Sequence, residues 1–145
     1  MKNVIGLIVT IVIFGGLCIG SYIIHNNANN CYTKLSASEL SKKVADKDSF
    51  VLLVTNSRLT ADQNFKEDLR LISEENNLKV YYVDVKNMDT DDLTVVMNVV
   101  SFDTVPTLAF ISKGVETDRT NRLVGYNDDT NNNITTILTK NGYLK

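Results

Sequence analysis

A stretch of 31 residues without a formal charge divides this 145-residue chain into two unlike parts. After Lys2 there is no Lys, Arg, Asp or Glu until Lys34, and only His25 between them can become charged near neutral pH. A chain of this length is sufficient for one ordinary domain and not for two. We therefore expect a single domain after the uncharged stretch. The uncharged stretch itself is suited to an apolar environment.

Residues 3–24 are the apolar part of the stretch, and we expect them to cross a membrane. As a helix they would extend about 33 Å at ~1.5 Å per residue, enough to span a hydrocarbon core of about 30 Å. A helix packed in a soluble core would have a polar face, which this segment lacks. We interpret residues 1–24 as an uncleaved, single-pass signal-anchor in the cell membrane, with the N-terminus inside and the domain on the extracytoplasmic side.

Two other interpretations of the N-terminal segment are open. Lys2 and the run Val4–Leu17 are typical of a cleaved signal peptide, with small residues near Cys18 as the cleavage site. The apolar run continues to Ile24, however, which favours the anchor. A lipoprotein site at Cys18 is less well supported, because Leu17 stands where Gly or Ala is preferred.

Residues 25–33 are polar and are expected to form a linker. Gly16 and Gly20 make a GxxxG pair, which would let two membrane helices approach closely. Cys31 would be a free thiol or would join two chains through a disulfide bond. A homodimer through the glycine pair or through Cys31 is therefore one alternative.

The segment 34–145 alternates between helical and strand patterns, as α/β domains do. Capping boxes at Ser36–Glu39 and Thr60–Gln63 each predict a helix start. The continuous apolar run Phe50–Thr55 predicts a central strand that is buried on both faces. The full set of expected elements comprises strands at 50–55, 78–85, 107–112 and about 119–125, and helices beginning near Ser36, Thr60, Asp89 and Asp128 or Thr130.

The only proline of the chain, Pro106, stands just before an expected strand, where it removes a donor from the sheet. With this proline and the order of its elements, the segment 34–145 resembles the thioredoxin-like superfamily over nearly its whole length. The resemblance implies a central mixed sheet flanked by helices and a cis peptide bond before Pro106. The matching features are the Phe50–Thr55 strand, the helix start near Thr60, Tyr82–Asn87, Val105–Thr107, the Lys113–Gly114 turn and Gly125.

Redox-active members of that superfamily carry a Cys-x-x-Cys pair at the start of the helix after the central strand, where the helix lowers the pKa of the first thiol. The corresponding segment 55–62 contains no cysteine. Cys18 and Cys31 both lie upstream of it. The strand position usually held by a buried carboxylate falls on Val51 or Leu53. The resemblance is therefore to a redox-inactive member, and dithiol exchange by this chain alone is excluded.

The other chemistry that the sequence offers is weak. Ser57 would need a base, and the only histidine, His25, lies in the linker. Thr60 and Asp62 are interpreted as helix-capping residues. The aspartates from Asp84 to Asp92 lack the Gly and the terminal Glu of a calcium loop. We expect no metal, no cofactor and no catalytic residue, and a net charge of −2 argues against nucleic acid as a partner.

The sequence predicts a binding or accessory module. In the thioredoxin-like fold, the proline loop and the adjacent helix start can hold extended polypeptide, with backbone pairing at the residue before the proline. The passages Tyr32–Leu40 and Lys79–Val85 resemble the thioredoxin-like bacteriocin transport accessory proteins of Gram-positive bacteria, which implies a role in bacteriocin or peptide export. The candidate peptide-binding residues are Ser57, Arg58, Leu59, Thr60, Val105 and Pro106.

Two further functions are consistent with the sequence. One is a thiol–disulfide oxidoreductase that uses Cys31 or the thiols of a partner protein. The other is a structural subunit of a membrane secretion or conjugation complex.

Overall fold

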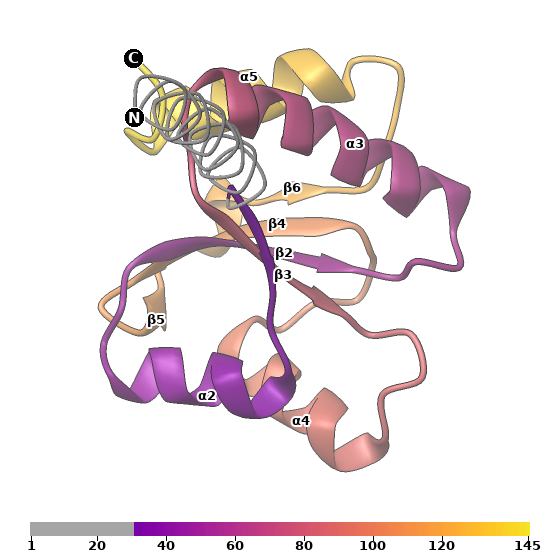
Figure 1. Cartoon of the computed structure of the whole chain (residues 1–145), viewed down its shortest axis with the longest axis vertical. Helices are drawn as coiled ribbons and strands as arrows, with labels where there is room; N and C mark the ends of the chain where they lie inside the picture. Colours follow the sequence, from indigo (N-terminus) through magenta and orange to yellow (C-terminus); the bar gives the residue numbers. More distant parts are fainter. Residues whose placement is uncertain (1–30) are drawn as a thin grey trace, which may run out of the picture. The chain divides into compact units, whose positions relative to one another are not determined.

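In the computed structural model, which describes residues 31–145, six strands form one sheet with helices on both faces (Figure 1). The strand order is β1–β3–β2–β4–β5, and β6 also pairs with β4. Strands β1, β2 and β3 are parallel, whereas β4 is antiparallel to β2, β5 and β6. The sheet is therefore mixed, as expected. The elements are β1 (Tyr32–Lys34), α2 (Ala37–Ala45), β2 (Phe50–Thr55), α3 (Thr60–Glu75), β3 (Val80–Asp84), α4 (Thr90–Val99), β4 (Thr107–Ser112), β5 (Val115–Glu116), the 3-10 turn η1 (Arg119–Asn121), β6 (Leu123–Val124) and α5 (Thr130–Lys140).

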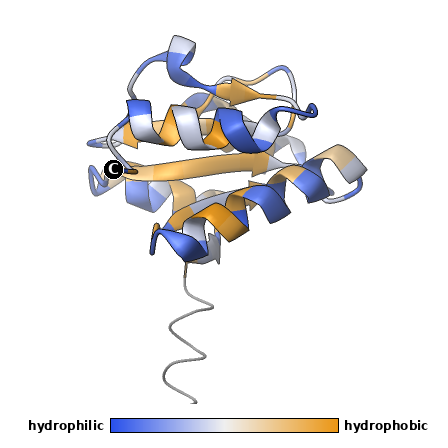
Figure 2. Ribbon diagram, turned by 90° about the horizontal axis from the view of Figure 1, so that it is seen from above, coloured by the Kyte–Doolittle hydropathy of each residue, from blue (hydrophilic) through white to orange (hydrophobic). Residues whose placement is uncertain are grey.

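Strand β2 lies at the centre of the sheet, and all six of its residues are buried. Leu52 and Val54 pack in a core cluster with α2 and α4, while Val51 and Leu53 pack in a second cluster with α3 and α5. In Figure 2 the strands are mostly hydrophobic, and the helices carry both hydrophobic and hydrophilic residues. The prediction of a strand buried on both faces is confirmed.

Two of the predicted helix starts are confirmed in detail. At the start of α2, the Glu39 N–H donates to Ser36 Oγ at 3.2 Å, and the Ser36 N–H donates to Glu39 Oε2 at 2.8 Å. At the start of α4, Asp89 Oδ1 accepts from the N–H of Asp92 at 2.8 Å. Each cap satisfies a main-chain donor that has no partner within the helix.

The capping box predicted at Thr60–Gln63 does not form. Helix α3 begins after Leu59, whose side chain caps nothing. The Asp62 carboxylate accepts from the N–H of Asn56, and Gln63 Nε2 donates to the carbonyl of Ser57 at 2.9 Å. Both side chains are thus used to hold the preceding loop against the helix.

Helix α5 begins at Thr130, within the predicted range, but neither Asp128 nor Thr130 is its N-cap residue. The helix begins after Asp129 without a side-chain cap. Thr130 Oγ1 instead accepts from the N–H of Asn127 at 2.7 Å and so holds the loop before the helix.

Three strands differ from the sequence prediction, and one of them, β5, was not predicted at all. Strand β1 includes Tyr32 and Thr33, which fall in the segment 25–33 that was predicted to be a linker, and it pairs with β3. The strand expected at 119–125 is reduced to Leu123–Val124. Asp118 accepts from the N–H of Thr120 at 2.8 Å and stabilises the turn η1 in place of a longer strand.

Within residues 31–145, no helix is both long enough and apolar enough to cross a membrane. The predicted membrane segment 3–24, including Gly16 and Gly20, lies outside the residues that the structure describes.

Candidate functional site

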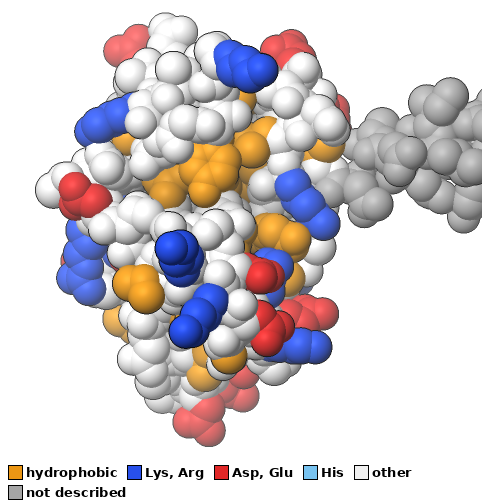
Figure 3. Space-filling model, turned by 90° about the vertical axis from the view of Figure 1, so that its left-hand side faces the viewer, with side chains coloured by type: hydrophobic (Ala, Val, Ile, Leu, Met, Phe, Trp, Pro, Cys, Tyr) orange, Lys and Arg blue, Asp and Glu red, His pale blue; other side chains and the backbone are white. Residues whose placement is uncertain are grey.

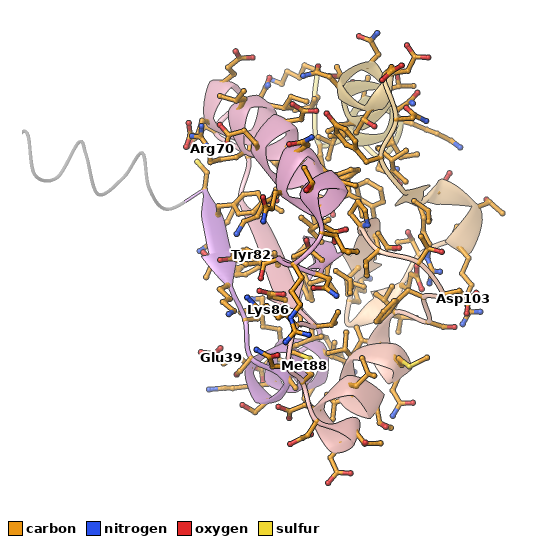
Figure 4. The ribbon with its side chains drawn as sticks, turned by 90° about the vertical axis from the view of Figure 1, so that its right-hand side faces the viewer. Glu39, Arg70, Tyr82, Lys86, Met88 and Asp103 are labelled. Atoms are coloured by element: carbon orange, nitrogen blue, oxygen red, sulfur yellow. The ribbon has the colours of Figure 1, made fainter. Side chains whose placement is uncertain are left out.

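Three loops meet at the end of the sheet where β2 and β3 finish and β4 begins. The register pairs Thr55 with Asp84 and Val54 with Thr107. The loops 56–59, 85–89 and 100–106 therefore leave the sheet at one edge, which we call the Pro106 edge. Figure 4 views the domain from this side, with Lys86 of the second loop near the middle and Asp103 of the third loop to one side.

The loop before β4 contains a cis peptide bond between Val105 and Pro106, which confirms the expectation from the resemblance. Thr107 Oγ1 donates to the carbonyl of Thr104 at 2.6 Å, and the Gly125 N–H donates to the carbonyl of Pro106 at 2.8 Å. These bonds hold the loop on both sides of the proline. Among the described residues, neither the N–H nor the carbonyl of Val105 has a hydrogen-bond partner. Its main chain is available to pair with another strand.

Exposed apolar side chains flank this loop. Three of the six large hydrophobic side chains that are exposed within residues 31–145 belong to Leu59, Val124 and Tyr126. Leu59 ends the loop after β2, and this loop leaves the sheet next to the loop of Pro106 because β2 pairs with β4. Val124 and Tyr126 flank Gly125, which is bonded to Pro106. Val124 and Tyr126 are not among the residues predicted from the sequence. We call Leu59, Val124 and Tyr126 the apolar rim.

The structure brings the predicted residues Ser57, Arg58 and Thr60 to the same edge. The Ser57 N–H donates to Asp84 Oδ1 at 3.1 Å. The Arg58 N–H donates to Asn56 Oδ1, and its guanidinium donates to Asn87 Oδ1. The Ser57 side chain also bonds to the Asp84 carboxylate, and these contacts fix the shape of the loop.

Asp62, in the first turn of α3, is a fully buried carboxyl group. Its Oδ1 accepts from Thr55 Oγ1 at 2.9 Å and from the Asn56 N–H at 2.6 Å. Its Oδ2 is buried and has no hydrogen-bond partner within residues 31–145. Burial raises the pKa of Asp62 above its usual value, and the charge of Asp84 adds to this increase while the two hydrogen bonds oppose it. A buried carboxyl therefore does lie next to the site, on the helix and not on the central strand.

Asp84 ends β3 on the other side of the same loop. Burial opposes its ionisation, but hydrogen bonds from Ser57 and from the Lys86 N–H together lower the pKa of Asp84 below its usual value. Asp62 and Asp84 both line a cavity of about 190 Å³ between α3 and the ends of β2 and β3. We call it the Asp62 cavity.

Cys31 is the only cysteine among the described residues, and its thiol is free and buried. Its carbonyl accepts from the Val80 N–H at 2.7 Å, at the beginning of β3. The Pro106 edge lies at the other end of that five-residue strand, about 16 Å away at ~3.3 Å per residue. The thiol of Cys31 is therefore remote from the Pro106 edge of its own chain.

Figure 3 views the domain from the side on which β2 begins, where hydrophobic side chains gather between scattered charged ones.

Within residues 31–145, no group of three or more His, Cys, Asp and Glu side chains could hold a metal ion together. Asp89 caps α4, and Asp84 holds the loop after β2. These aspartates thus serve the local structure.

No protein-family model matches the chain, and no curated protein sequence does either. Solved structures match it along nearly their whole length. Thioredoxin O2 from Arabidopsis thaliana is 17% identical with a TM-score of 0.59, and the match covers 77% of this chain and 95% of that one. Thioredoxin f2 from Chlamydomonas reinhardtii is 10% identical with a TM-score of 0.60, covering 79% and 99%. The Fasciola hepatica thioredoxin is 20% identical with a TM-score of 0.56, covering 74% and 97%.

At these identities the likeness concerns the fold. Residues 31–145 have a thioredoxin-like fold, with a mixed sheet and four helices, as the sequence resemblance implied.

Proposed function

We propose that this protein is a membrane-anchored, redox-inactive thioredoxin-fold module that binds extended polypeptide at the Pro106 edge. The observation that carries the proposal is the unpaired main chain of Val105 beside a cis proline, bordered by the apolar rim. A peptide lying beside Val105 can form main-chain hydrogen bonds with it, as in the addition of a strand to a sheet. Its apolar side chains can pack against the rim, and the loop from Ser57 to Thr60 closes the other side.

Replacing Leu59 with Asp is expected to weaken the binding of an extended, apolar peptide about tenfold or more. The change removes apolar contact and places a carboxylate where the complex excludes water, a cost of at least about 1.4 kcal/mol. The affinity of the full-length chain in mild detergent can be measured by fluorescence anisotropy with labelled peptides.

Leu71→Asp is the matched control. Leu71 lies on α3, the helix that begins directly after Leu59. The side chain of Leu71 is 44% exposed, and that of Leu59 is 45% exposed. It lines a separate cavity between α3 and α5, so its replacement should leave the affinity unchanged. Equal losses in the two variants, or no peptide binding by the unchanged protein, would contradict the proposal.

The absence of cysteine from segment 55–62 and the position of Cys31 support redox inactivity. In an insulin-reduction assay, the full-length chain should give only the background rate, and Cys31→Ser should not alter it. Turnover that depends on Cys31, or that appears when a thiol-bearing partner is added, would favour the alternative of an oxidoreductase.

The apolar segment 3–24 supports membrane anchoring, with the domain on the extracytoplasmic side. The full-length chain should remain with membranes after an alkaline carbonate wash, and deletion of residues 3–24 should release it. A protease added outside intact spheroplasts should digest the domain. Retention of the deleted chain on membranes would argue against this anchor.

The passages Tyr32–Leu40 and Lys79–Val85 support a narrower proposal, in which the bound polypeptide is a bacteriocin or another exported peptide of a Gram-positive bacterium. A photoreactive residue at position 59 should then crosslink the exported peptide in cells. Crosslinks only from residues 3–24 to membrane proteins would favour a structural subunit of a secretion or conjugation complex. A homodimer through Gly16 and Gly20 or through Cys31 would appear as crosslinks between two copies of the chain.

A further inference from the structure

The Asp62 cavity lies directly under the loop that forms one side of the Pro106 edge. Its lining includes Thr55 and Ser57, at the end of β2 and in the following loop, as well as Asp62 and Asp84. A volume of about 190 Å³ is several times the roughly 30 Å³ that one water molecule occupies in the liquid. The cavity therefore has room for an alkyl chain with a polar end.

The two basic side chains that line the cavity are already engaged. Arg70 pairs with Glu67 and with Glu74, at 2.6 Å in each case. The ammonium of Lys66 lies 3.7 Å from the centre of the Tyr82 ring, a cation–π contact. Of the carboxyl groups that line the cavity, Glu67 is paired with Arg70, whereas Asp62 and Asp84 have no salt bridge within the described residues. Burial and then the charge of Asp84 raise the pKa of Asp62, and the charge of Lys34 acts on Asp84.

The hydrogen bonding of Asp62 defines which group would fit. Oδ1 is used by Thr55 and Asn56, so Oδ2 is the one oxygen that is free to accept. A guanidinium prefers to bind both oxygens of a carboxylate with its planar fork. An ammonium group is a compact donor that needs only one oxygen at each acceptor. No group of three or more His, Cys, Asp and Glu side chains within residues 31–145 could hold a metal ion, and the single free oxygen of Asp62 suits an ammonium donor.

We propose that the Asp62 cavity binds a primary ammonium group through Asp62 Oδ2 and Asp84. This inference rests on the proposed function for its occupant: a Lys side chain, or the N-terminal amine, of the polypeptide held at the Pro106 edge. Asp62 is fully buried, and Gln63 and Lys66 also line the cavity, so an ammonium group would reach Asp62 through a rotamer change of these two long side chains. Lys66 is four residues from Asp62 on the same helix and is thus the internal competitor for this position.

The cavity can be tested without a peptide. The full-length chain, labelled with ¹⁵N in mild detergent, is titrated with n-butylammonium while the amide signals of Asn56 and Ser57 are followed. A saturable shift is expected with n-butylammonium and none with tetramethylammonium, which has no N–H to donate. The shift should disappear in Asp62→Asn and persist in Asp68→Asn, which changes the same charge on the same helix outside the cavity. A shift that appears only in Lys66→Met would overturn the proposal, because Lys66 would then be the natural occupant.

The occupant is tested with matched peptides. A peptide with Lys should bind about tenfold more tightly than the same peptide with norleucine, which keeps the alkyl chain and lacks the amine. Comparison of free with acetylated N-termini separates the two sources of the ammonium. Equal affinities for all these peptides would overturn the inference and leave the proposed function standing. Failure of every peptide to bind, with an intact n-butylammonium response, would overturn the proposed function and keep the ammonium site.

The Asp62→Asn variant is checked for folding by the dispersion of its amide spectrum. If it does not fold, the comparisons made on the unchanged protein still decide: equal responses to n-butylammonium and tetramethylammonium would overturn the proposal.

Discussion

Gly114→Ala should lower the free energy of unfolding by about 2–5 kcal/mol, which is a large part of the stability of a domain of this size. Gly114 has φ +78°, where an L-residue with a Cβ is strained. An added Cβ would also lie 2.3 Å from the main-chain oxygen of Val44 and 3.2 Å from its carbonyl carbon. These are main-chain atoms at the end of α2, so relief requires the helix to move away from the turn between β4 and β5. Urea denaturation of the two proteins measures the loss.

Gly142→Ala separates the contact from the backbone strain. Gly142 has φ +76°, but nothing lies within 4 Å of the position where its Cβ would stand. This substitution should cost only the strain, about 1–2 kcal/mol. If both variants lose the same stability, the close approach of Gly114 to α2 does not limit the fold.

Arg122→Met should lower the free energy of unfolding by about 3–5 kcal/mol. The side chains of Arg122 and Glu116 are 11% and 9% exposed, and the guanidinium donates to both carboxylate oxygens of Glu116. It also donates to the carbonyl of Ser101 at 2.6 Å. The substitution leaves a nearly buried carboxylate and a carbonyl without their donor. Arg122 thus ties the β5–β6 segment to the loop that leads to Pro106.

The double variant Glu116→Leu with Arg122→Met tests whether the pair, and not the packing of Arg122, accounts for this effect. Removal of both charges should recover most of the stability, because apolar side chains of similar volume can replace a buried ion pair at little cost. A double-mutant cycle gives the interaction free energy between Glu116 and Arg122. Additive losses would show that the two side chains contribute independently.

The parts of the fold that follow from local chemistry could be predicted from the sequence. The run Phe50–Thr55 contains no polar residue before its last position, and its length and branched residues favour a strand covered on both faces, which the structure shows. The caps at Ser36 and Asp89 depend on residues within three positions of each other. The cis bond at Pro106 followed from resemblance and not from the residues themselves.

The parts that depend on tertiary pairing could not be predicted. Strand β1 has three residues, too few to show an alternating pattern, and it exists because β3 offers an edge. The box at Thr60–Gln63 had the correct residue types, but the preceding loop competes for the Asp62 carboxylate and the Gln63 amide. A local motif specifies a cap only when no stronger partner is near.

The residues of the candidate site also divide into those that could be predicted from the sequence and those that depend on tertiary pairing. Leu59, Val105 and Pro106 were named from the sequence, and the structure places them at one edge. Val124 and Tyr126 were missed, because only the pairing of β6 with β4 brings them there. The burial of Asp62 could have been predicted from its spacing, because Asp62, Phe65 and Leu69 share one face of α3, and that face is buried.

The position of Cys31 has a mechanical consequence. The chain enters the domain at the beginning of β1, whereas the Pro106 edge lies where the parallel strands finish. A protein held through the residues before Cys31 and pulled through a ligand at the Pro106 edge would bear the force along its strands. The hydrogen bonds between β1 and β3, with those from the Val80 N–H to Cys31 and from the Leu35 N–H to Tyr82, would then be sheared together and not opened one after another. The short strand β1 would be the element that sets how much tension the domain withstands while it holds a polypeptide.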